Sequence, residues 1–465
     1  MTPDLRRIVD VAPLVQSGAL SPVTLVRACL AQIDARPETN AFITRLDAKA
    51  LADARECERE ILAGHYRGPL HGIPVSAKDL IDVAGVKTTS GSALPATEAM
   101  ADAPAIARLR AAGAIIIGKT NLHEFAFGTT SEESAFGPVR NPHDPSRSAG
   151  GSSGGAAAAL VTGMCFGALG TDTGGSIRIP SAACGTVGLK PTIGEISCEG
   201  VVPLSTSLDH LGPMARSVAD VALLFDVLTG RPPPPPMESM PRMASMESTQ
   251  SESNPREKSR FVFGVPRPYF CDRLDAGVRQ ALERTCSTLT AAGHTIRDLA
   301  IEHAAWTPDV YLHIVLPEAS RYHARFLERH PTLYSPGVRV RLEMGRYLLA
   351  EDYVRAMRVR EVLAAEVDRA LDGCDALLLP TLPIPAPPLG AATVDVNGTS
   401  EPVRAAMLRL TQLFNITGHP ALALPAPQEV DTLPRSVQII GRRHQTNRLL
   451  IIGHTVERCL KQQAE

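Results

Sequence analysis

Two clusters of glycine and serine constrain this chain more than any other feature. Residues 150–155 read GGSSGG and residues 174–176 read GGS, both within the stretch 148–192. Glycine loses more conformational entropy on folding than other residues and offers no side chain to pack. Four glycines in the six residues 150–155 therefore indicate a backbone that adopts positive φ or approaches a ligand closely. The serines in both clusters predict that hydroxyl groups line that site.

The segment between the clusters predicts how they meet. Residues 156–163 are small and compatible with a helix, and residues 166–169 form an apolar run long enough for a buried strand. The stretch therefore predicts a loop, a helix, a strand and a second loop. This order can return both serine loops to the same end of a sheet.

Helical and strand patterns alternate along most of the chain. Helices are predicted at residues 5–15, 22–33 (with Ser21 as the N-cap), 48–62, 103–112, 217–228, 276–292, 310–329, 339–370 and 447–460. Strands are predicted at residues 41–44, 70–77, 114–117, 261–265, 376–379, 422–425 and 436–440. Such alternation predicts an α/β fold with a mostly buried sheet.

Length, charge and cysteine usage exclude several classes of protein. With 465 residues, 44% of them hydrophobic, the chain can bury a large core. A net charge of −2 gives no electrostatic reason to expect a nucleic-acid or membrane partner. The nine cysteines include no C-x-x-C pair, which argues against a disulfide framework and a structural zinc site. No signal sequence or long apolar run is present, so we expect a cytoplasmic protein.

Residues 231–260 interrupt the alternation. They hold five consecutive prolines and four methionines among many serine and glutamate residues. Because this composition favours neither a helix nor a strand that could pack in the core, we interpret the segment as a linker or a disordered insertion.

Two short motifs match known patterns without the structural context that those patterns need. Residues 113–120 fit the P-loop pattern, but the variable positions read Ala-Ile-Ile-Ile, which favours a strand over a phosphate-binding loop. Residues 150–154 fit the G-x-S-x-G nucleophile elbow, but residues 143–147 before them are typical of a turn rather than a strand. Nucleotide binding is therefore disfavoured.

A set of longer blocks indicates a family. The blocks are HGIPVSAKD at 71–79, GKTN at 118–121, FGPVRNP at 136–142, SLDHLGP at 207–213 and QIIG at 438–441. With the stretch 148–192 they resemble, in the same order, the amidase signature hydrolases, which cleave carboxamide C–N bonds. The resemblance implies one domain over residues 1–465, with the segment 231–260 inside it. It also implies a large mixed β-sheet covered on both faces by α-helices.

The resemblance assigns roles to three polar residues. It implies that Ser176 is the nucleophile, Lys78 the base, and Ser152, on a cis peptide bond, a relay for the proton between them. The chemistry agrees, because a serine hydroxyl needs an adjacent base and a buried lysine can have a pKa low enough to act as one. The resemblance further implies an oxyanion hole made by Thr173, Gly174, Gly175 and Ser176, whose glycines allow N–H groups to crowd a ligand.

Other polar residues near these blocks compete for the same roles. Asp79 and Lys119 are interpreted as structural, and Asp172 with Arg178 as a buried ion pair or loop-fixing contact. A histidine could in principle be the base, with candidates His71, His123, His143 and His210, but turn or surface polarity is the simpler explanation of those four histidines.

The resemblance places the substrate beside residues 121–130. The expected substrate-binding residues are Phe125, Phe127, Gly128, Thr129 and Ile179. The glutamyl-tRNA amidotransferase A subunit usually has Met at the position of Phe127 and Gln at that of Ile179. Both differences make the pocket more apolar and favour an apolar acyl or aryl group over glutamine. Phe125 and Phe127 can equally be core residues.

The sequence therefore predicts a serine amidohydrolase for small amides, with aryl amides and carbamates (a urethanase activity) both open. The alternative is the glutaminase (A) subunit of a tRNA-dependent amidotransferase, and a non-catalytic scaffold is a third reading. We expect no cofactor, no metal, and a small-molecule amide or carbamate as partner. Whether the chain is a monomer or a homodimer stays open.

Overall fold

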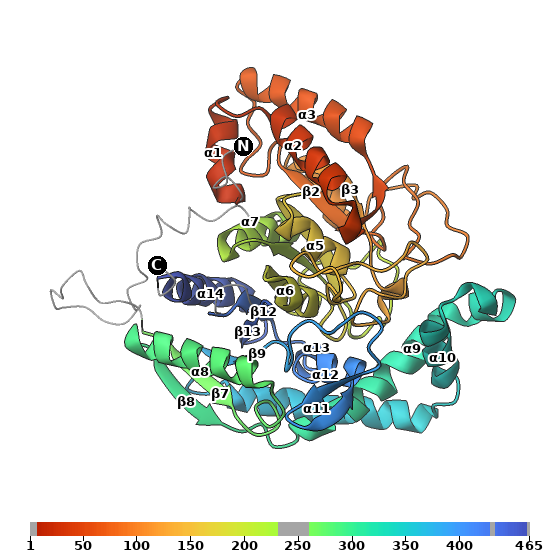
Figure 1. Cartoon of the computed structure of the whole chain (residues 1–465), viewed down its shortest axis with the longest axis vertical. Helices are drawn as coiled ribbons and strands as arrows, with labels where there is room; N and C mark the ends of the chain where they lie inside the picture. The colour runs from red at the N-terminus through yellow and green to blue at the C-terminus, as the bar shows by residue number, and fades with distance from the viewer. Residues whose placement is uncertain (1–6, 231–259, 428–432, 463–465) are drawn as a thin grey trace.

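An 11-stranded mixed β-sheet forms the centre of the computed structural model, which describes residues 7–230, 260–427 and 433–462. The strand order is β1-β3-β2-β4-β6-β5-β12-β13-β9-β7-β8, so the sheet joins strands from both ends of the chain (Figure 1). The predicted linker or insertion at 231–260 lies outside the described residues, apart from residue 260.

The strands are short and mostly buried. Their bounds are β1 Phe42–Arg45, β2 Pro74–Lys78, β3 Ile115–Thr120, β4 Gly167–Asp172, β5 Val187–Lys190, β6 His210–Ala215, β7 Val262–Pro266, β8 Thr295–Leu299, β9 Ala376–Pro380, β12 Ala421–Pro425 and β13 Ser436–Ile440. A separate hairpin pairs β10 Thr393–Val396 with β11 Thr399–Pro402.

Helices surround the sheet. Their bounds are α1 Ile8–Gln16, α2 Pro22–Ala35, α3 Asp47–Leu62, α4 Pro104–Ala111, α5 Gly154–Val161, α6 Arg178–Cys184, α7 Val218–Thr229, α8 Ala276–Ala291, α9 Thr307–Arg329, α10 Pro336–Gly345, α11 Ala350–Ala370, α12 Val403–Leu408, α13 Gln412–Ile416 and α14 Thr446–Lys461. The predicted cap is confirmed, because Ser21 Oγ accepts hydrogen bonds from Val23 N (3.1 Å) and Thr24 N (3.4 Å).

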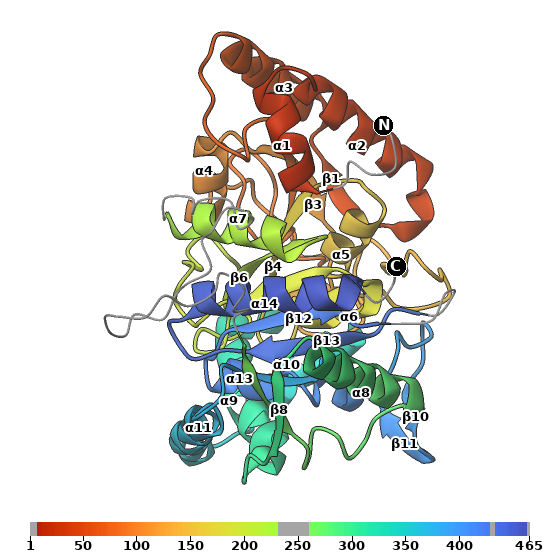
Figure 2. The same ribbon diagram turned by 90° about the vertical axis from the view of Figure 1, so that its left-hand side faces the viewer.

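Glycines on β4 show that helices cover both faces of the sheet. A Cβ at Gly167 would meet Leu224 of α7 at 2.8 Å, whereas one at Gly170 would meet Ser153 Oγ at 2.9 Å and Ile177 at 3.1 Å. Residues three apart on a strand point to opposite faces. Thus α7 covers one face, and the segments around α5 and α6 cover the other. Figure 2 looks onto the first face, where α7, α14 and α8 lie in front of the strands.

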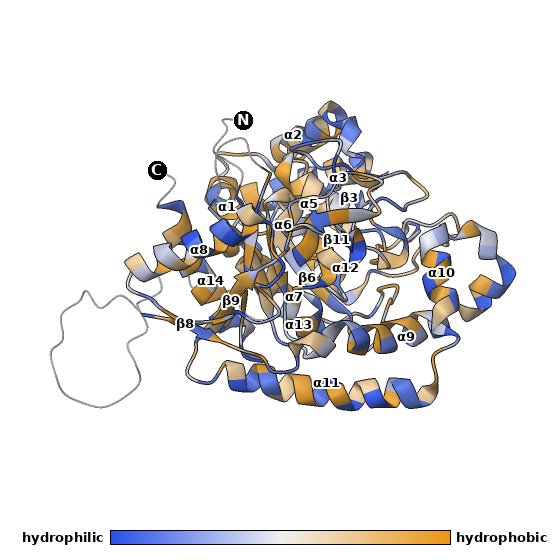
Figure 3. Cartoon of the chain, turned by 60° about the horizontal axis from the view of Figure 1, so that its bottom comes forward, coloured by the Kyte–Doolittle hydropathy of each residue, from blue (hydrophilic) through white to orange (hydrophobic). Residues whose placement is uncertain are grey.

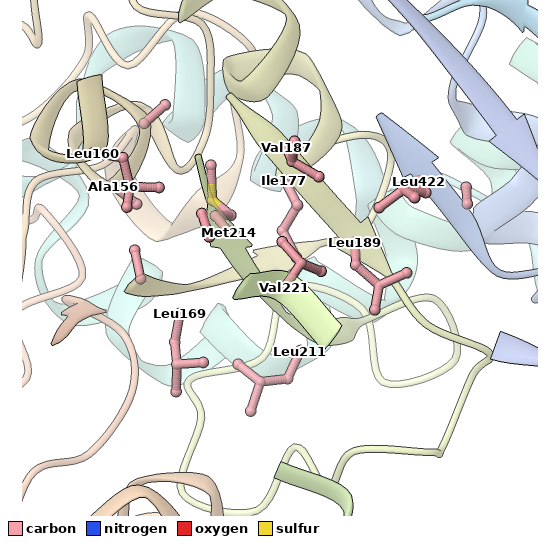
Figure 4. Close-up of a cluster of buried hydrophobic side chains, with 14 of the residues drawn as sticks. Ala156, Leu160, Leu169, Ile177, Val187, Leu189, Leu211, Met214, Val221 and Leu422 are labelled. Atoms are coloured by element: carbon pink, nitrogen blue, oxygen red, sulfur yellow. The ribbon is translucent and has the colours of Figure 1, made fainter. Parts of the chain in front are cut away.

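Close packing against small residues builds the core between these layers. Leu160 and Met214 lie toward α5, and Leu169 and Leu211 lie on the other side of the central strands (Figure 4). All four side chains are at most 1% exposed. Interiors of this density have little room for added volume, so the run of alanines in α5 fits a helix pressed onto a sheet.

Two predicted boundaries were wrong. Residues 70–73 do not belong to β2, because Gly72 adopts a φ of +79° and the strand begins only at Pro74. The single helix predicted at 339–370 is two helices, α10 and α11. At Gly345 a Cβ would lie 2.2 Å from the Leu316 carbonyl oxygen of α9, so close helix contact ends α10 there, and Leu349 is extended before α11.

Helices α9, α10 and α11 form an extension beside the main body, and α11 alternates apolar and polar residues along its length (Figure 3). Across the described ranges, none of the helices combines the length and the apolar character needed to cross a lipid bilayer. All nine cysteines are free thiols, as the absence of paired spacing predicted.

Candidate active site

Parallel pairing of two strands brings the candidate site together. β2 and β4 are parallel neighbours, with Ala77 opposite Leu169. Their carboxyl ends therefore reach the same edge of the sheet, where β2 ends at Lys78 and β4 ends at Asp172. The loop 173–176 follows β4 directly and leads into α6. The predicted return of the serine loops to one end of the sheet is confirmed.

Lys78 is a fully buried lysine that contacts hydroxyl groups. Its Nζ donates to Ser152 Oγ at 2.7 Å and to Thr171 Oγ1 at 2.8 Å. Burial lowers the pKa of Lys78 to about 7, against the opposing attraction of Asp172 and Asp209. Near neutral pH a large share of this amine is therefore unprotonated and able to accept a proton.

Ser152 lies at the junction of the two serine loops. The Gly151–Ser152 peptide bond is cis, as the resemblance implied. The Ser152 carbonyl oxygen accepts from His123 N and Ser131 Oγ, each at 3.2 Å. One residue on, Ser153 N donates to the Ser176 carbonyl oxygen at 3.2 Å. These bonds hold the first loop against the second.

Ser176 is slightly exposed, and its hydroxyl is unbonded throughout the described ranges. Ser176 is 6% exposed, whereas Lys78 and Ser152 are fully buried. Within the described part of the chain, the Ser176 hydroxyl has no hydrogen-bond partner, so the link from Ser152 to Ser176 is not formed here, although the loops touch. The backbone N–H groups of the four residues predicted for the oxyanion hole, Thr173, Gly174, Gly175 and Ser176, likewise have no acceptor among the described residues. Four unused amide donors in succession can bind an oxyanion.

The two loop glycines are needed because other chain segments pack so close to them that a side chain would not fit. A Cβ at Gly174 would lie 2.6 Å from Tyr311 Oη, and one at Gly175 would lie 2.4 Å from Thr411 Oγ1. Gly175 also has a φ of +137°, which L side chains rarely adopt. Thr411 Oγ1 donates to the Gly174 carbonyl oxygen at 2.6 Å and so fixes the loop from behind.

Asp172 and Arg178 form the buried ion pair that was one of the two roles expected for them. Arg178 Nε and Nη2 donate to the two Asp172 carboxylate oxygens, each at 3.0 Å, and both side chains are fully buried. Burial alone would raise the pKa of Asp172, but the attraction of Arg178 holds it well below its usual range. The same guanidinium also donates to Gln438 Oε1 (3.0 Å) and Asn415 Oδ1 (2.7 Å).

Asp79 and Lys119 form a second buried pair. Lys119 Nζ lies 2.9 Å from Asp79 Oδ1, and neither side chain is exposed. Lys119 Nζ also donates to the Lys87 carbonyl oxygen at 3.0 Å and to Thr88 Oγ1 at 2.8 Å. These contacts agree with the structural role predicted for both residues. Residues 115–120 of the P-loop match form β3, so the match is mostly a strand.

Asp209 is a candidate site residue that sequence reasoning missed. Thr173 Oγ1 donates to Asp209 Oδ1 at 2.5 Å, and Leu204 N donates to Oδ2 at 2.9 Å. Burial raises the pKa of Asp209 to about 6 in spite of these bonds. Its block, residues 207–213, carried part of the family resemblance, but nothing local indicated that the carboxylate holds the loop 173–176.

The candidate histidine bases are occupied elsewhere. His210 Nδ1 lies 2.7 Å from the Leu208 carbonyl oxygen, and His143 Nε2 lies 2.9 Å from that of Cys184. His123 Nε2 lies 3.2 Å from Glu133 Oε2, and His71 Nε2 lies 3.0 Å from Glu60 Oε2. In the ranges described, none of these four rings contacts the hydroxyl of Ser152 or Ser176.

The residues expected to bind substrate lie in two settings. The Phe125 ring packs against His323 (4.4 Å between ring centroids) and Tyr334 (5.6 Å), so it belongs to the packing under α9. The Phe127 ring instead lies near two guanidinium groups, those of Arg341 (5.2 Å) and Arg404 (5.5 Å). The surroundings of the Phe127 ring are therefore more cationic than the apolar pocket predicted from the sequence.

Gly128, Thr129 and Ile179 surround the serine loops. A Cβ at Gly128 would overlap the His123 ring at 2.0 Å, so the backbone there packs directly against that ring. The Thr129 carbonyl carbon lies 2.9 Å from the position of a Cβ at Gly151, next to Ser152. Ile179 Cδ1 lies 2.8 Å from the position that a Cβ at Gly175 would occupy. Substrate contact by these residues stays a prediction.

One group of side chains in the described ranges has the composition of a metal site. Glu302, His303 and Glu366 bring their ligand atoms within 4.8 Å of one another. Glu366 Oε2 already accepts from His303 N at 3.0 Å, and its Oε1 contacts the His303 ring. The group contributes nothing to the loops 150–153 and 173–176.

Known proteins resemble this chain over nearly its whole length. A family model described as Amidase matches residues 24–450. An amidase of Pseudomonas putida is 39% identical, covering 97% of this chain and 95% of the relative. The A subunit of the glutamyl-tRNA(Gln) amidotransferase of Carboxydothermus hydrogenoformans is 35% identical, covering 96% of each chain. A crystal structure of an amidase matches with a TM-score of 0.89 and 38% identity, covering 98% of this chain and 100% of the other.

The buried pair leads to a stability prediction. Asp172→Ala should lower the free energy of unfolding by about 3–5 kcal/mol, because it leaves the Arg178 charge buried without its partner. Urea denaturation measures this loss. The control is Asp53→Ala, which removes an exposed pair with Lys49 (2.9 Å) and should cost at most about 1 kcal/mol. Similar small losses in both variants would contradict the prediction.

Proposed function

The chain belongs to the amidase family and is a hydrolase of carbon–nitrogen bonds, and on that basis we propose that it cleaves small amides or carbamates through an acyl-enzyme on Ser176. The observation that carries the proposal is the bond from Lys78 Nζ to Ser152 Oγ (2.7 Å), with a lysine whose pKa burial lowers to about 7. This pair supplies a base where serine chemistry needs one.

The proposed first step forms the acyl-enzyme. Neutral Lys78 takes the proton of Ser152, and Ser152 takes the proton of Ser176 as its Oγ attacks the substrate carbonyl carbon. A hydroxyl suits the middle position, since it donates to one partner and accepts from the other. The relay requires a side-chain rearrangement that brings Ser152 Oγ and Ser176 Oγ together, because no hydrogen bond joins these two atoms in this structure.

The loop 173–176 stabilises the charge that develops. When the C=O bond opens, its oxygen gains a negative charge that the free N–H groups of Gly174, Gly175 and Ser176 can bind. As the intermediate collapses, the C–N bond breaks and the departing amine takes a proton from the relay. Water then attacks the ester carbonyl, the same relay accepts a proton from this water, and the acid leaves while Ser176 regains its hydrogen.

A glutaminase subunit is the second candidate, and relatives named as that subunit favour it at 35% identity. It would act on glutamine and deliver ammonia to another protein. Ile179, where that subunit usually carries Gln, supports the stand-alone enzyme, whereas the guanidinium groups beside Phe127 weaken the same argument at that position.

Loss of the nucleophile gives the first test of activity. The purified chain and Ser176→Ala are assayed on glutamine, a short aliphatic amide, a p-nitroanilide and an aryl carbamate. We expect wild-type turnover of a small amide or carbamate, and a loss of at least about 10³-fold in Ser176→Ala with binding retained, because only the bond-forming atom is removed. Substantial residual turnover would refute the assignment of Ser176, and turnover of glutamine alone would favour the amidotransferase subunit.

The pKa of Lys78 gives a pH prediction. Because the neutral amine is the base, kcat/KM should rise about tenfold per pH unit below pH 7 and level off above it. Lys78→Ala should abolish this activity, whereas Lys49→Ala, on an exposed lysine, should keep both rate and profile. Wild-type turnover by Lys78→Ala near pH 7 would place the base elsewhere.

A further inference from the structure

A carboxylate of α9, that of Glu318, lies on the helix face that contacts the loop 173–176. Tyr311 and Glu318 are seven residues apart on α9, which is about two helical turns, so they share a face. Tyr311 Oη lies 2.6 Å from where a Cβ at Gly174 would be. Ile314, between them on the same face, is fully buried. Glu318 therefore faces the main body of the protein, where a carboxylate needs hydrogen-bond donors.

Three donors meet the Glu318 carboxylate. Ser205 Oγ donates to its Oε2 at 2.6 Å, and Ser207 N donates to the same oxygen at 3.1 Å. Tyr353 Oη of α11 donates to Oε1 at 2.9 Å. One carboxylate oxygen thus holds the segment 205–207, and the other ties Glu318 to α11. Glu318 in this way joins the extension of α9 and α11 to a segment that lies far earlier in the chain.

Ser205 carries this link on to Asp209. Its N–H donates to Asp209 Oδ2 at 3.1 Å, and its carbonyl oxygen accepts from Asp209 N at 2.8 Å. Ser205 is therefore bonded to Glu318 through its hydroxyl and to Asp209 through its backbone. Because Ser205 and Asp209 form one hydrogen-bonded turn, a movement of Ser205 away from Glu318 would displace the Asp209 carboxylate.

Asp209 in turn fixes the first residue of the loop 173–176. Thr173 Oγ1 donates to Asp209 Oδ1 at 2.5 Å, and Thr411 Oγ1 donates to the Gly174 carbonyl oxygen at 2.6 Å. Glycines can adopt many backbone angles, so contacts from outside the loop must set the directions of its N–H groups. The bonds at Thr173 and Gly174 do so, because each planar peptide unit passes the orientation of a held group on to the next N–H.

We propose that Glu318 is a positioning residue for the oxyanion hole. Glu318 holds Ser205, Ser205 holds Asp209, and Asp209 holds Thr173. The N–H groups of the loop 173–176 therefore stay directed at the carbonyl oxygen as its charge develops. Glu318 acts through this chain of bonds and not by contact with the substrate. The inference rests on the proposed function and deepens it, because it identifies a residue of α9 on which the rate of the reaction at Ser176 depends.

Replacement of Glu318 tests this link. With p-nitroacetanilide as the substrate, Glu318→Ala should lower kcat about 10- to 100-fold, the effect of a distant change that misplaces the groups at the reaction centre. KM should change less than about threefold, because the oxyanion hole binds the charged transition state more strongly than the neutral carbonyl. Glu318→Gln keeps an oxygen that can accept from Ser205 and Ser207 and should restore most of the rate. An unchanged kcat in Glu318→Ala, or a loss that appears only in KM, would overturn the proposal.

A double-mutant cycle separates positioning from general damage. Thr173→Val removes only the hydroxyl that bonds to Asp209 and should lower kcat to a similar extent. If Glu318 acts through Thr173, adding Glu318→Ala to Thr173→Val should lower kcat by no more than about threefold, whereas losses that multiply would overturn the proposal. Glu328→Ala, at a residue farther along α9 whose side chain is 61% exposed, is the control and should leave kcat unchanged. If Glu318→Ala does not fold, Ser205→Ala removes the same link from its other side and replaces it in the cycle.

A covalent probe distinguishes failure of this inference from failure of the proposed function. A phosphonofluoridate reacts with an activated serine and needs no amide bond: Ser176 Oγ attacks phosphorus, fluoride leaves, and the serine proton passes to the base. The P=O oxygen gains charge as Oγ adds, so the same N–H groups accelerate this reaction. Glu318→Ala should lower the rate of labelling at Ser176 at least about tenfold, and Glu328→Ala should not.

The labelling rates then separate the two failures. If the wild type turns over neither amides nor carbamates but its labelling depends on Glu318, only the proposed function fails. Equal labelling rates in the wild type and Glu318→Ala would refute the role of Glu318 whatever the activity. A wild type that is neither labelled at Ser176 nor active would refute both.

Discussion

The buried pair of Asp172 and Arg178 is the contact on which the site depends. The two residues flank the loop 173–176, and their side chains close it into a small ring. Asp172 Oδ2 also accepts from Ile177 N at 3.2 Å and so supports the start of α6. Through Asn415 and Gln438 the pair ties α13 and β13 to the same point. A buried pair adds little net stability compared with apolar packing, but it fixes one geometry, because every alternative leaves a charge unpaired.

Neighbouring groups decide what each buried lysine at this edge can do. Burial lowers the pKa of Lys119 too, but Lys119 touches a carboxylate, Asp79, whose attraction opposes that shift and agrees with a structural role. Lys78 touches only hydroxyl groups, and the acidic residues that attract it, Asp172 and Asp209, are held by Arg178 and Thr173. Burial then dominates the pKa of Lys78 and makes a base available. The reactivity proposed for Lys78 thus depends on the fact that the nearest carboxylates are already bonded to other residues.

The sequence could predict elements whose determinants are local, and it missed those fixed by distant contacts. The N-cap of α2 and the β-branched strand β3 can each be predicted from a few neighbouring residues. Helix α6 was not predicted, because it is short, contains Pro180, and is fixed at its start by Asp172. In the site, Lys78, Ser152 and Ser176 were found through motifs. Asp209 carries no such signal, since its bonds to Thr173 and Leu204 exist only in the folded chain.

The structure separates the residues proposed for the chemistry from those that shape the substrate space. The relay and the oxyanion loop come from β2, β4 and the serine loops, all in the first 180 residues. The residues that press on Gly174 and Gly175 are Tyr311, Leu408 and Thr411, from α9 and the region of α12 and α13. Glycine at both positions allows this approach, so a change in these later helices alters the wall of the site without moving the nucleophile. Specificity in this chain should therefore vary with residues of these later helices, far in sequence from Lys78 and Ser176, while the proposed reaction at Ser176 stays the same.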